Sequence, residues 1–471
     1  MNKILGVTMF VVGLCCASCS DDDESISYSQ KPIANSELKT ILMQKGYQFS
    51  EDGKLLLDDL ANNTTTLDLS GTNITDLSEL DILPNLKEVD LSDNGYGPAF
   101  NFSQLPTQIT GIDLRGNKIY DFEGLVDASV VNDEVQTTIL HNLTKLYLPE
   151  TAKWNVEDLM PFYTKNQADG TNVDMQMVDE DGNLQAYNTL REIPDEYFRA
   201  YLKTKFASLF PDDGTQIDIS KPMGLTESGE SINLWYANQF ADIAKIKSIE
   251  GVEYFINNPY YKDFWVSIGC EQELFTVSYL APRANIKSIC LYSTNTPDGL
   301  DFSKATKLAA LSFKGNESLT TLDLSNTLIG NQDISEYESS VSNQLYLNNC
   351  ANLTNIVLPS EGVGVMSTFA LINLPKLETI DLSGIKAIEF LSLLKLQNCK
   401  ITYPTALQYR FRAAYKTLTP LSADDQILFA ISEDVFGKDE TKDFITNYRS
   451  YLMDYWMLYI ADGGYMWSAQ M

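Results

Sequence analysis

The single histidine of the chain, His141, limits the catalytic chemistry that the sequence can support. One imidazole excludes a zinc site built on several histidines, and it allows a Ser-His-Asp triad only if His141 itself is the base. The residues around His141 contain neither a C-x-x-C nor an H-E-x-x-H pattern. We therefore expect a solvent-exposed loop histidine without a catalytic role.

The 64 acidic residues offer many carboxylate pairs, but no spacing among them predicts the enclosed cleft that a glycosidase needs. The Asp52-Gly53 and Asp213-Gly214 turns do not fit the calcium loop of an EF-hand, because carboxylates are missing at the first and third positions of that loop. We expect no enzymatic activity, no metal site and no cofactor.

Aspartate recurs at the middle position of short apolar pairs, as in Leu67-Asp68-Leu69, where alternation along a strand points it away from the core. If these pairs form neighbouring strands, the aspartates lie roughly 5 Å apart on one sheet face. Either this acidic ladder recognises a partner, or the aspartates recur for solubility and for local backbone reasons. The candidate binding residues are Asp68, Asp90, Asp113, Asp301, Asp323 and Asp381, flanked by Glu88, Arg115, Tyr147 and Tyr279.

Apolar residues recur at a spacing of about two dozen residues, which is typical of a solenoid. Leu67, Val89, Ile112 and Leu146 follow one another at steps of 22, 23 and 34. Later in the chain two sets recur in parallel, and both lengthen to 34 in the same coil, where residues 330–342 are inserted. These sets are Phe264, Ile289, Leu311, Leu345, Phe369 and Leu394, and Val277, Leu300, Leu322, Ile356 and Ile380.

The earlier repeats resemble the ordinary leucine-rich repeat L-x-x-L-x-L-x-x-N, with Thr72, Asn94 or Asn117 after the strand. The later ones, with L-x-x-I-x-L-P around Ile356, resemble the BspA-like leucine-rich repeat of bacterial surface proteins. This resemblance implies a leucine-rich-repeat solenoid of the α/β class, with a parallel sheet on the concave face and an irregular convex side. It also implies recognition of an extracellular protein, as in adhesion to host or matrix proteins. The alternative is a glycan-binding lipoprotein accessory to polysaccharide uptake.

The first residues resemble a bacterial lipoprotein signal. Lys3 and the apolar run Ile4–Leu14 form a secretory signal peptide, and Cys16-Ala17-Ser18-Cys19 is similar to a lipoprotein cleavage site with Cys19 as the lipidated residue. The acidic run at 20–24 is similar to the surface-export signal of Bacteroidetes lipoproteins. We expect a surface-exposed protein that contacts the outer membrane only through this lipid anchor. The net charge of −30 argues against nucleic-acid binding.

Helical patterns divide the chain. Residues 33–47 and the I-P-D-x-x-F-R-x-x-L segment from Ile193 predict amphipathic helices that cover the ends of two tandem modules. Residues 406–415, 424–432 and 439–460 predict a helical cap, whose aromatic stripe either packs on the last coil or binds a ligand. The predicted organisation is a signal peptide (1–18), a tether (19–32), a first capped module (33–163), a linker (164–190), a second capped module (191–402) and a C-terminal cap (403–471).

The seven cysteines do not form a regular disulfide framework. Cys270, Cys350 and Cys399 lie at or next to inward positions, where thiols pack as small apolar groups. Cys290 alternates with Ile289 and Leu291 and should point outward. A Cys270–Cys290 disulfide is an alternative that an extracytoplasmic compartment would permit.

Overall fold

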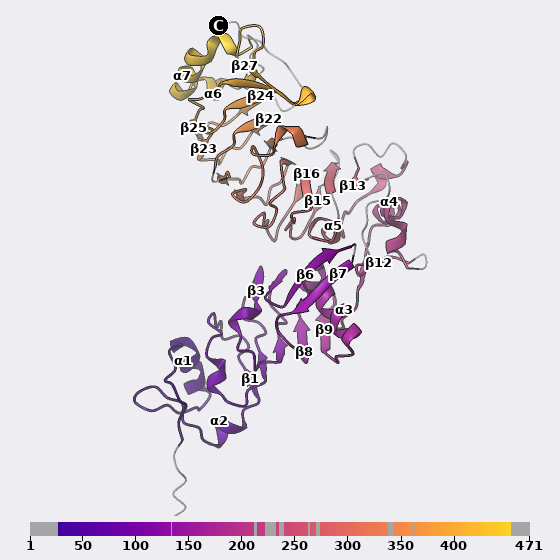
Figure 1. The fold of residues 1–471 in the computed structure, drawn as a ribbon, viewed down its shortest axis with the longest axis vertical. Coiled ribbons are helices and arrows are strands. Elements are labelled where there is room, and N and C mark those ends of the chain that lie inside the picture. The colour runs from indigo at the N-terminus through magenta and orange to yellow at the C-terminus, as the bar shows by residue number, and fades with distance from the viewer. Residues whose placement is uncertain are drawn as a thin grey trace, which may run out of the picture.

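The computed structural model shows an α/β protein whose strands are mostly parallel and whose helices are few. It describes residues 27–453, apart from 133, 212–213, 222–231, 235–239, 262–263, 270–273, 338–342 and 360. The chain runs from α1 near one end of an elongated molecule to α7 at the other (Figure 1). The predicted signal peptide, Cys19, the acidic run and the aromatic residues after 453 lie outside the described residues.

A six-stranded sheet forms in the first half of the chain, in the order β1-β2-β4-β8-β9-β10. The predicted alignment is confirmed, because Leu67, Val89, Ile112 and Leu146 pair in parallel register and all four are buried. Its strands are β1 (Thr66–Asp68), β2 (Glu88–Asp90), β4 (Gly111–Asp113), β8 (Lys145–Leu148), β9 (Asp174–Val178) and β10 (Leu184–Ala186).

Asparagines tie neighbouring strands of this sheet together where the chain turns off each strand. The Asn117 side chain donates to the Leu91 and Leu114 carbonyls at 3.0 and 2.9 Å and accepts the Asn94 N–H at 3.0 Å. Asn94 donates in turn to the Leu69 carbonyl at 2.9 Å. Both asparagines are buried, so these bonds satisfy backbone groups that water does not reach.

Residues 164–190, which were predicted to form a linker, form regular structure instead. Helix α3 (Leu159–Asp169) extends into this segment, and β9 then adds to the sheet in parallel, with Met175 opposite Leu146. Strand β10 closes this edge in the antiparallel direction. Polar, glycine-containing composition suggested a linker, but the alternation of Met175 and Met177 with polar residues suits a strand with one buried face.

Smaller elements flank the first sheet. The predicted first helix is α1 (Ser36–Gln44), where Asn35 caps the N-terminus by accepting the Leu38 N–H, and Leu38, Ile41 and Leu42 are buried. The other elements are α2 (Asp59–Asn63), the parallel pair β3 (Ala99–Asn101) and β5 (Asp121–Glu123), the hairpin β6 (Val126–Val131) and β7 (Glu134–Ile139), and the 3₁₀ turns Leu80–Ile82, Phe102–Gln104 and Glu150–Trp154.

The second half contains a ten-stranded sheet that is parallel over most of its width. Ile289, Leu311, Leu345 and Phe369 pair in the predicted register. The two outer positions were misplaced, since Val266 and Leu391 occupy them in place of Phe264 and Leu394. The strands are β13 (Ile232–Asn233), β14 (Phe264–Gly269), β16 (Ile286–Tyr292), β18 (Ala310–Lys314), β20 (Gln344–Asn348), β22 (Val365–Ile372), β24 (Ala387–Leu394), β26 (Tyr409–Arg412), β27 (Thr417–Pro420) and β28 (Leu428–Ile431).

Three of the five residues of the second predicted set lie on separate two-stranded sheets, whereas Val277 and Leu300 lie outside these strands. Leu322 pairs with Ile356 in parallel, as expected, but Ile380 pairs with Ile401 in the next small sheet. The three sheets are β15 (Phe275–Thr276) with β17 (Thr294–Asn295), β19 (Thr321–Asp323) with β21 (Asn355–Val357), and β23 (Thr379–Asp381) with β25 (Lys400–Thr402).

The second predicted amphipathic helix is α4 (Glu196–Phe206), which Asp195 caps by accepting the Tyr197 and Phe198 N–H groups. The remaining elements before the large sheet are the antiparallel pair β11 (Leu190–Glu192) and β12 (Gln216–Asp218), and α5 (Glu253–Ile256). The 3₁₀ turns of this half are Ala207–Leu209, Ile243–Lys245, Ile334–Glu336, Ala413–Tyr415 and Arg449–Tyr451.

The predicted helical cap at 403–471 is wrong in part. Within 406–415 and 424–432 the structure has β26 and β28, which both pair with β24. An uncovered β24 would expose a row of unpaired N–H and C=O groups, and these strands satisfy them. Short helices then follow as α6 (Glu433–Phe436) and α7 (Asp439–Tyr448), whose Phe444 and Ile445 are buried.

Two large apolar cores underlie the two sheets. The second core extends into the first half of the chain, because it includes Tyr120, Trp154, Val156 and Met160. Within the described part of the chain, no helix has both the length and the apolar character needed to cross a membrane.

Candidate functional site

Six of the ten predicted binding residues lie together on the outward face of the first sheet. Sheet register places Asp68, Asp90, Asp113 and Tyr147 in one row across β1, β2, β4 and β8. A second row on the same face contains Glu88, Lys145 and Asp174. We call this surface the acidic face: Asp68, Glu88, Asp90, Asp113, Arg115, Lys145, Tyr147 and Asp174.

One ion pair crosses a glycine on this face. The Lys145 Nζ lies 3.0 Å from the Glu88 carboxylate, although β4 runs between their two strands. A Cβ on Gly111 would lie 2.5 Å from the Glu88 Cγ, so Gly111 leaves the space in which Glu88 reaches across. Partial burial is the largest single influence on the Lys145 pKa and lowers it, but the hydrogen bond to Glu88 and the charges of Glu88, Tyr147 and Asp113 together raise this pKa overall.

Arg115 and Tyr147 form the centre of the acidic face. The Arg115 Nε lies 2.9 Å from both Asp113 oxygens, and this hydrogen bonding raises the Arg115 pKa. The guanidinium is 5.7 Å and the Lys145 Nζ 4.8 Å from the centroid of the Tyr147 ring, within cation–π range. The Tyr147 hydroxyl donates to Asp174 at 2.8 Å. Cations therefore already occupy the Asp113 end of the face.

The β1–β2 end differs, because Asp68 and Asp90 lie side by side without an ion-pair partner among the described residues. Asp68 is exposed and Asp90 half-buried. The hydrogen bonds from the Ser70 hydroxyl and N–H hold the pKa of Asp68 below its usual range, so this carboxylate stays charged. This end of the face can attract a cationic group.

The other four predicted residues are not part of this surface. Asp323 and Asp381 are exposed on the small sheets of β19 and β23, and Asp301 lies in a loop. Tyr279 was expected on an outward face, which is wrong: it is buried and stacks on Tyr120 with 4.4 Å between ring centroids. The predicted continuous ladder of six aspartates is therefore wrong, and three of them form a row.

A local hydrogen bond explains why aspartate recurs at all six positions. In each case the Oδ1 atom accepts the backbone N–H two residues later, which fixes the turn after the strand. The donors are Ser70, Ser92, Arg115, Ser303, Ser325 and Ser383. Of the two explanations that the sequence allowed, local backbone structure thus accounts for the recurrence of aspartate. It does not account for the grouping of three of these aspartates on the acidic face.

One row on the outward face of the large sheet carries small or neutral side chains. Sheet register aligns Ser267, Cys290, Ser312, Tyr346, Ala370 and Ser392 across β14, β16, β18, β20, β22 and β24. We call this row the neutral face. Its members Ser312, Ala370 and Ser392 are buried, so an ionised side chain has no room at these positions.

The described cysteines are free thiols. Cys350 and Cys399 are buried as predicted, and burial raises the pKa of each to about 11. Cys290 lies on the outward side as predicted, half-buried, and burial likewise raises its pKa to about 11. None of these thiols is therefore an activated nucleophile at neutral pH. Cys270 lies outside the described residues.

The predicted exposure of His141 to solvent is wrong. His141 is buried, with its Nε2 atom 2.8 Å from the Ile109 carbonyl oxygen and its ring centroid 5.8 Å from that of Phe102. The imidazole thus links the chain after the β6–β7 hairpin to the loop before β4. No signal in the sequence distinguished this buried position from a loop.

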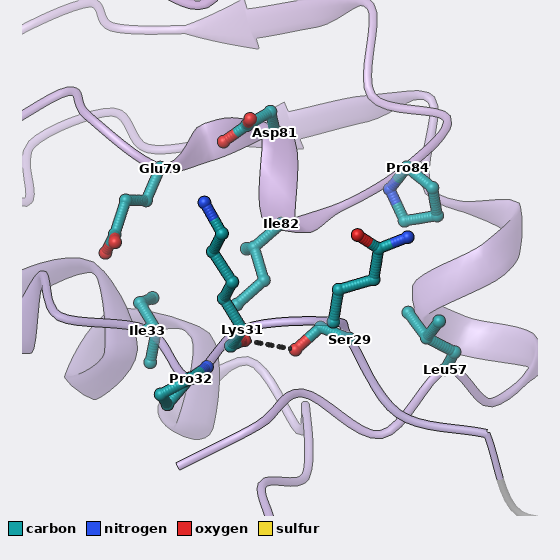
Figure 2. Close-up of a pocket in the computed structure, with 10 residues that line it drawn as sticks. Ser29, Lys31, Pro32, Ile33, Leu57, Glu79, Asp81, Ile82 and Pro84 are labelled. Carbon is teal, nitrogen blue, oxygen red and sulfur yellow. Dashed lines mark hydrogen bonds between the residues drawn. The ribbon is translucent and has the colours of Figure 1, made fainter.

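A pocket of about 540 Å³ lies between the N-terminal segment and the 3₁₀ turn at Leu80–Ile82. Figure 2 shows Lys31 projecting into it between Glu79 and Asp81, with the Ser29 hydroxyl bonded to the Lys31 carbonyl. The Glu79 carboxylate accepts the N–H groups of Ala34 and Asn35, at 2.8 and 2.7 Å, so it holds the start of α1. The pocket thus serves the attachment of the N-terminal segment.

Two members of the acidic face were missed from the sequence. Lys145 could have been found, because alternation places it on the same side of its strand as Tyr147. Asp174 could not, since its strand lies in the predicted linker.

A scan against protein-family models finds no match for this chain, and a search of curated proteins finds no similar sequence.

Proposed function

We propose that this chain is a non-enzymatic binding protein that uses its acidic face to recognise a basic patch on an extracellular protein. The unpaired carboxylates of Asp68 and Asp90 carry this proposal, because they lie side by side on an exposed sheet face. The Arg115–Tyr147 centre supplies an amphipathic platform beside them. Such a shallow, polar surface suits a protein partner better than a small substrate.

The architecture that we propose is a leucine-rich-repeat solenoid with a BspA-like second module. Three observations support it: aligned buried aliphatic residues in both sheets, a second row of short strands in the later half, and asparagines that bond the turns of neighbouring coils. We further propose that Cys19 is lipidated and that the protein is displayed at the outer-membrane surface, on the basis of the cleavage-site resemblance.

The test is to screen the mature chain against extracellular-matrix proteins and a glycan array, and then to compare two double variants. Asp68→Asn with Asp90→Asn removes the unpaired charges of the acidic face. Asp323→Asn with Asp381→Asn is the matched control, since both aspartates make the same local hydrogen bond on other sheets.

We expect the first double variant to weaken a protein interaction about tenfold and to reduce its salt dependence, because both effects arise from exposed charges. The control should bind as wild type. Equal affinities for all three proteins would refute a role of the acidic face. Binding to glycans alone would favour the alternative function in polysaccharide uptake.

A further inference from the structure

The two halves of the chain are joined by side chains that are far apart in sequence. Tyr120 stacks on Tyr279, and Trp154 packs on Tyr254 with 4.9 Å between ring centroids. Between them the Tyr260 hydroxyl donates to the Glu157 carbonyl at 2.7 Å. The two halves therefore meet in an extended contact.

A buried group of charges lies in this contact. Asp121 and Glu157 come from the first half, and both accept hydrogen bonds from the Arg283 Nη2 of the second half, Asp121 at 2.7 Å. The Lys304 Nζ lies 3.1 Å from the other Asp121 oxygen. Asp158 completes the group, because its carboxylate lies within 4.8 Å of those of Asp121 and Glu157. We call these five residues the junction cluster.

In the junction cluster the carboxyl groups outnumber the cations that could neutralise them. Three carboxyl groups face two cations, and one of these cations, Lys304, keeps 43% of its side chain exposed. Arg283, Asp121 and Glu157 are buried. Asp158 accepts hydrogen bonds from Asn155 and from the Phe122 N–H but forms no ion pair with a described residue. A buried carboxylate without a cation is costly, so a proton on Asp158 lowers the energy of the closed junction.

We propose that the junction cluster is a proton-dependent latch, in which protonation of Asp158 holds the two halves of the molecule together and its ionisation loosens them. Arg283 and Lys304 carry the ion pairs that link the two halves within the junction cluster, and the Lys118–Asp298 and Lys153–Glu250 pairs cross the contact beside it. The proposal does not depend on the binding role of the acidic face.

Asp158 in the closed junction titrates near neutral pH. Burial raises its pKa to about 7, and the neighbouring Asp121 carboxylate adds to this rise. Its carboxyl group is enclosed by protein although the residue as a whole keeps some exposure. In an opened junction the pKa returns toward about 4. The closed form thus holds the proton more tightly, so closure is favoured at acidic pH and is lost as the pH rises toward 7.

Other charged and titratable side chains face the cluster from the elements around it and must be held constant in a test. They are Glu123 of β5, Lys118 and Tyr120 with their partner Asp298, Tyr260, and Tyr279 with the nearby Asp301. Burial raises the pKa of Tyr260 and Tyr279 far above neutrality, so these hydroxyls stay neutral in the pH range of the test.

The experiment is hydrogen exchange of the mature chain between pH 5 and 8, read by mass spectrometry and corrected for the intrinsic exchange rate at each pH. Peptides that cover 118–123, 154–160 and 279–285 report on the junction. We expect the opening equilibrium there to rise by up to about tenfold per pH unit and to level off above pH 7, as one linked proton requires. Asp158→Asn should abolish the rise and keep the junction closed.

Glu253→Gln is the matched control. Glu253 is also buried, and burial raises its pKa to about 7, but its carboxylate accepts the N–H groups of Gly251 and Ser278 and stands outside the junction cluster. Its variant should keep the pH dependence at the junction. A second variant, Arg283→Met, should exchange rapidly in the three peptides at every pH, with small-angle scattering showing a wider range of shapes. The proposal is overturned if wild-type junction exchange does not depend on pH, or if Asp158→Asn retains the wild-type slope.

Discussion

The two sheets bury the same kind of side chain but differ in the charge of their outward side chains. Leu67, Val89, Ile112 and Leu146 stack across the first sheet as Ile289, Leu311, Leu345 and Phe369 stack across the second. Outward, the first sheet presents carboxylates with two cations and a tyrosine, whereas the neutral face of the second presents serines, an alanine, a cysteine and a tyrosine. The recurring aliphatic residues thus determine what each sheet buries, whereas the outward residues differ between the two sheets.

The largest expected effect tests the claim that the interiors are equivalent. Leu146→Ala and Phe369→Ala each remove a fully buried side chain from the middle of a sheet, and each should lower the free energy of unfolding by roughly 3–5 kcal/mol. Urea denaturation followed by circular dichroism measures both. A loss below about 1 kcal/mol in either variant would show that its sheet does not depend on this row.

A smaller effect on stability should distinguish the outward faces of the two sheets. Ser312→Asp places a carboxylate at a position that is 4% exposed, where the hydroxyl accepts a bond from Gln344, and should cost roughly 1–3 kcal/mol. The converse change on the acidic face, Asp90→Ser, should cost less than about 1 kcal/mol because Asp90 reaches solvent. The same denaturation measurement compares them, and similar costs would contradict the difference between the faces.

The smallest effect concerns the pH dependence of Asp68. Its hydrogen bonds with Ser70 lower its pKa, so the stability that they provide is present above about pH 4 and is lost as the pH falls through the native pKa. The side chain is exposed, so the loss should stay below about 1 kcal/mol. The difference in unfolding free energy between wild type and Asp68→Asn should therefore shrink from pH 6 to pH 3, and a constant difference would argue against these bonds.

The buried part of the fold could be predicted from the sequence, and most of the surface could not. Aliphatic residues at a constant spacing can satisfy each other only as neighbours, which is why Leu345 and Phe369 pair as expected. Aspartate carries less information, because the bond from Asp323 to the Ser325 N–H forms equally well on any strand. Alternation alone therefore could not show that Asp323 lies on a small sheet and Asp90 on the acidic face.

The C-terminal segment and the junction could not be predicted from the sequence, for a different reason. Periodicity around Phe411 and Phe429 fits a helix or a buried strand, and only the open edge of β24 decides between them. Arg283 lies 162 residues from Asp121 and 126 from Glu157 in sequence. No local pattern connects residues at such separations, so the junction cluster becomes visible only when the two halves meet.

The β6–β7 hairpin has a practical consequence. It lies within the 34-residue step between Ile112 and Leu146, yet these two residues still pair in register. Extra chain is thus accommodated outside the first sheet, and most of the hairpin between Asp127 and Thr138 is exposed. This is where the polypeptide can gain length during evolution at little energetic cost, and an epitope tag inserted between Val131 and Glu134 should leave both sheets undisturbed.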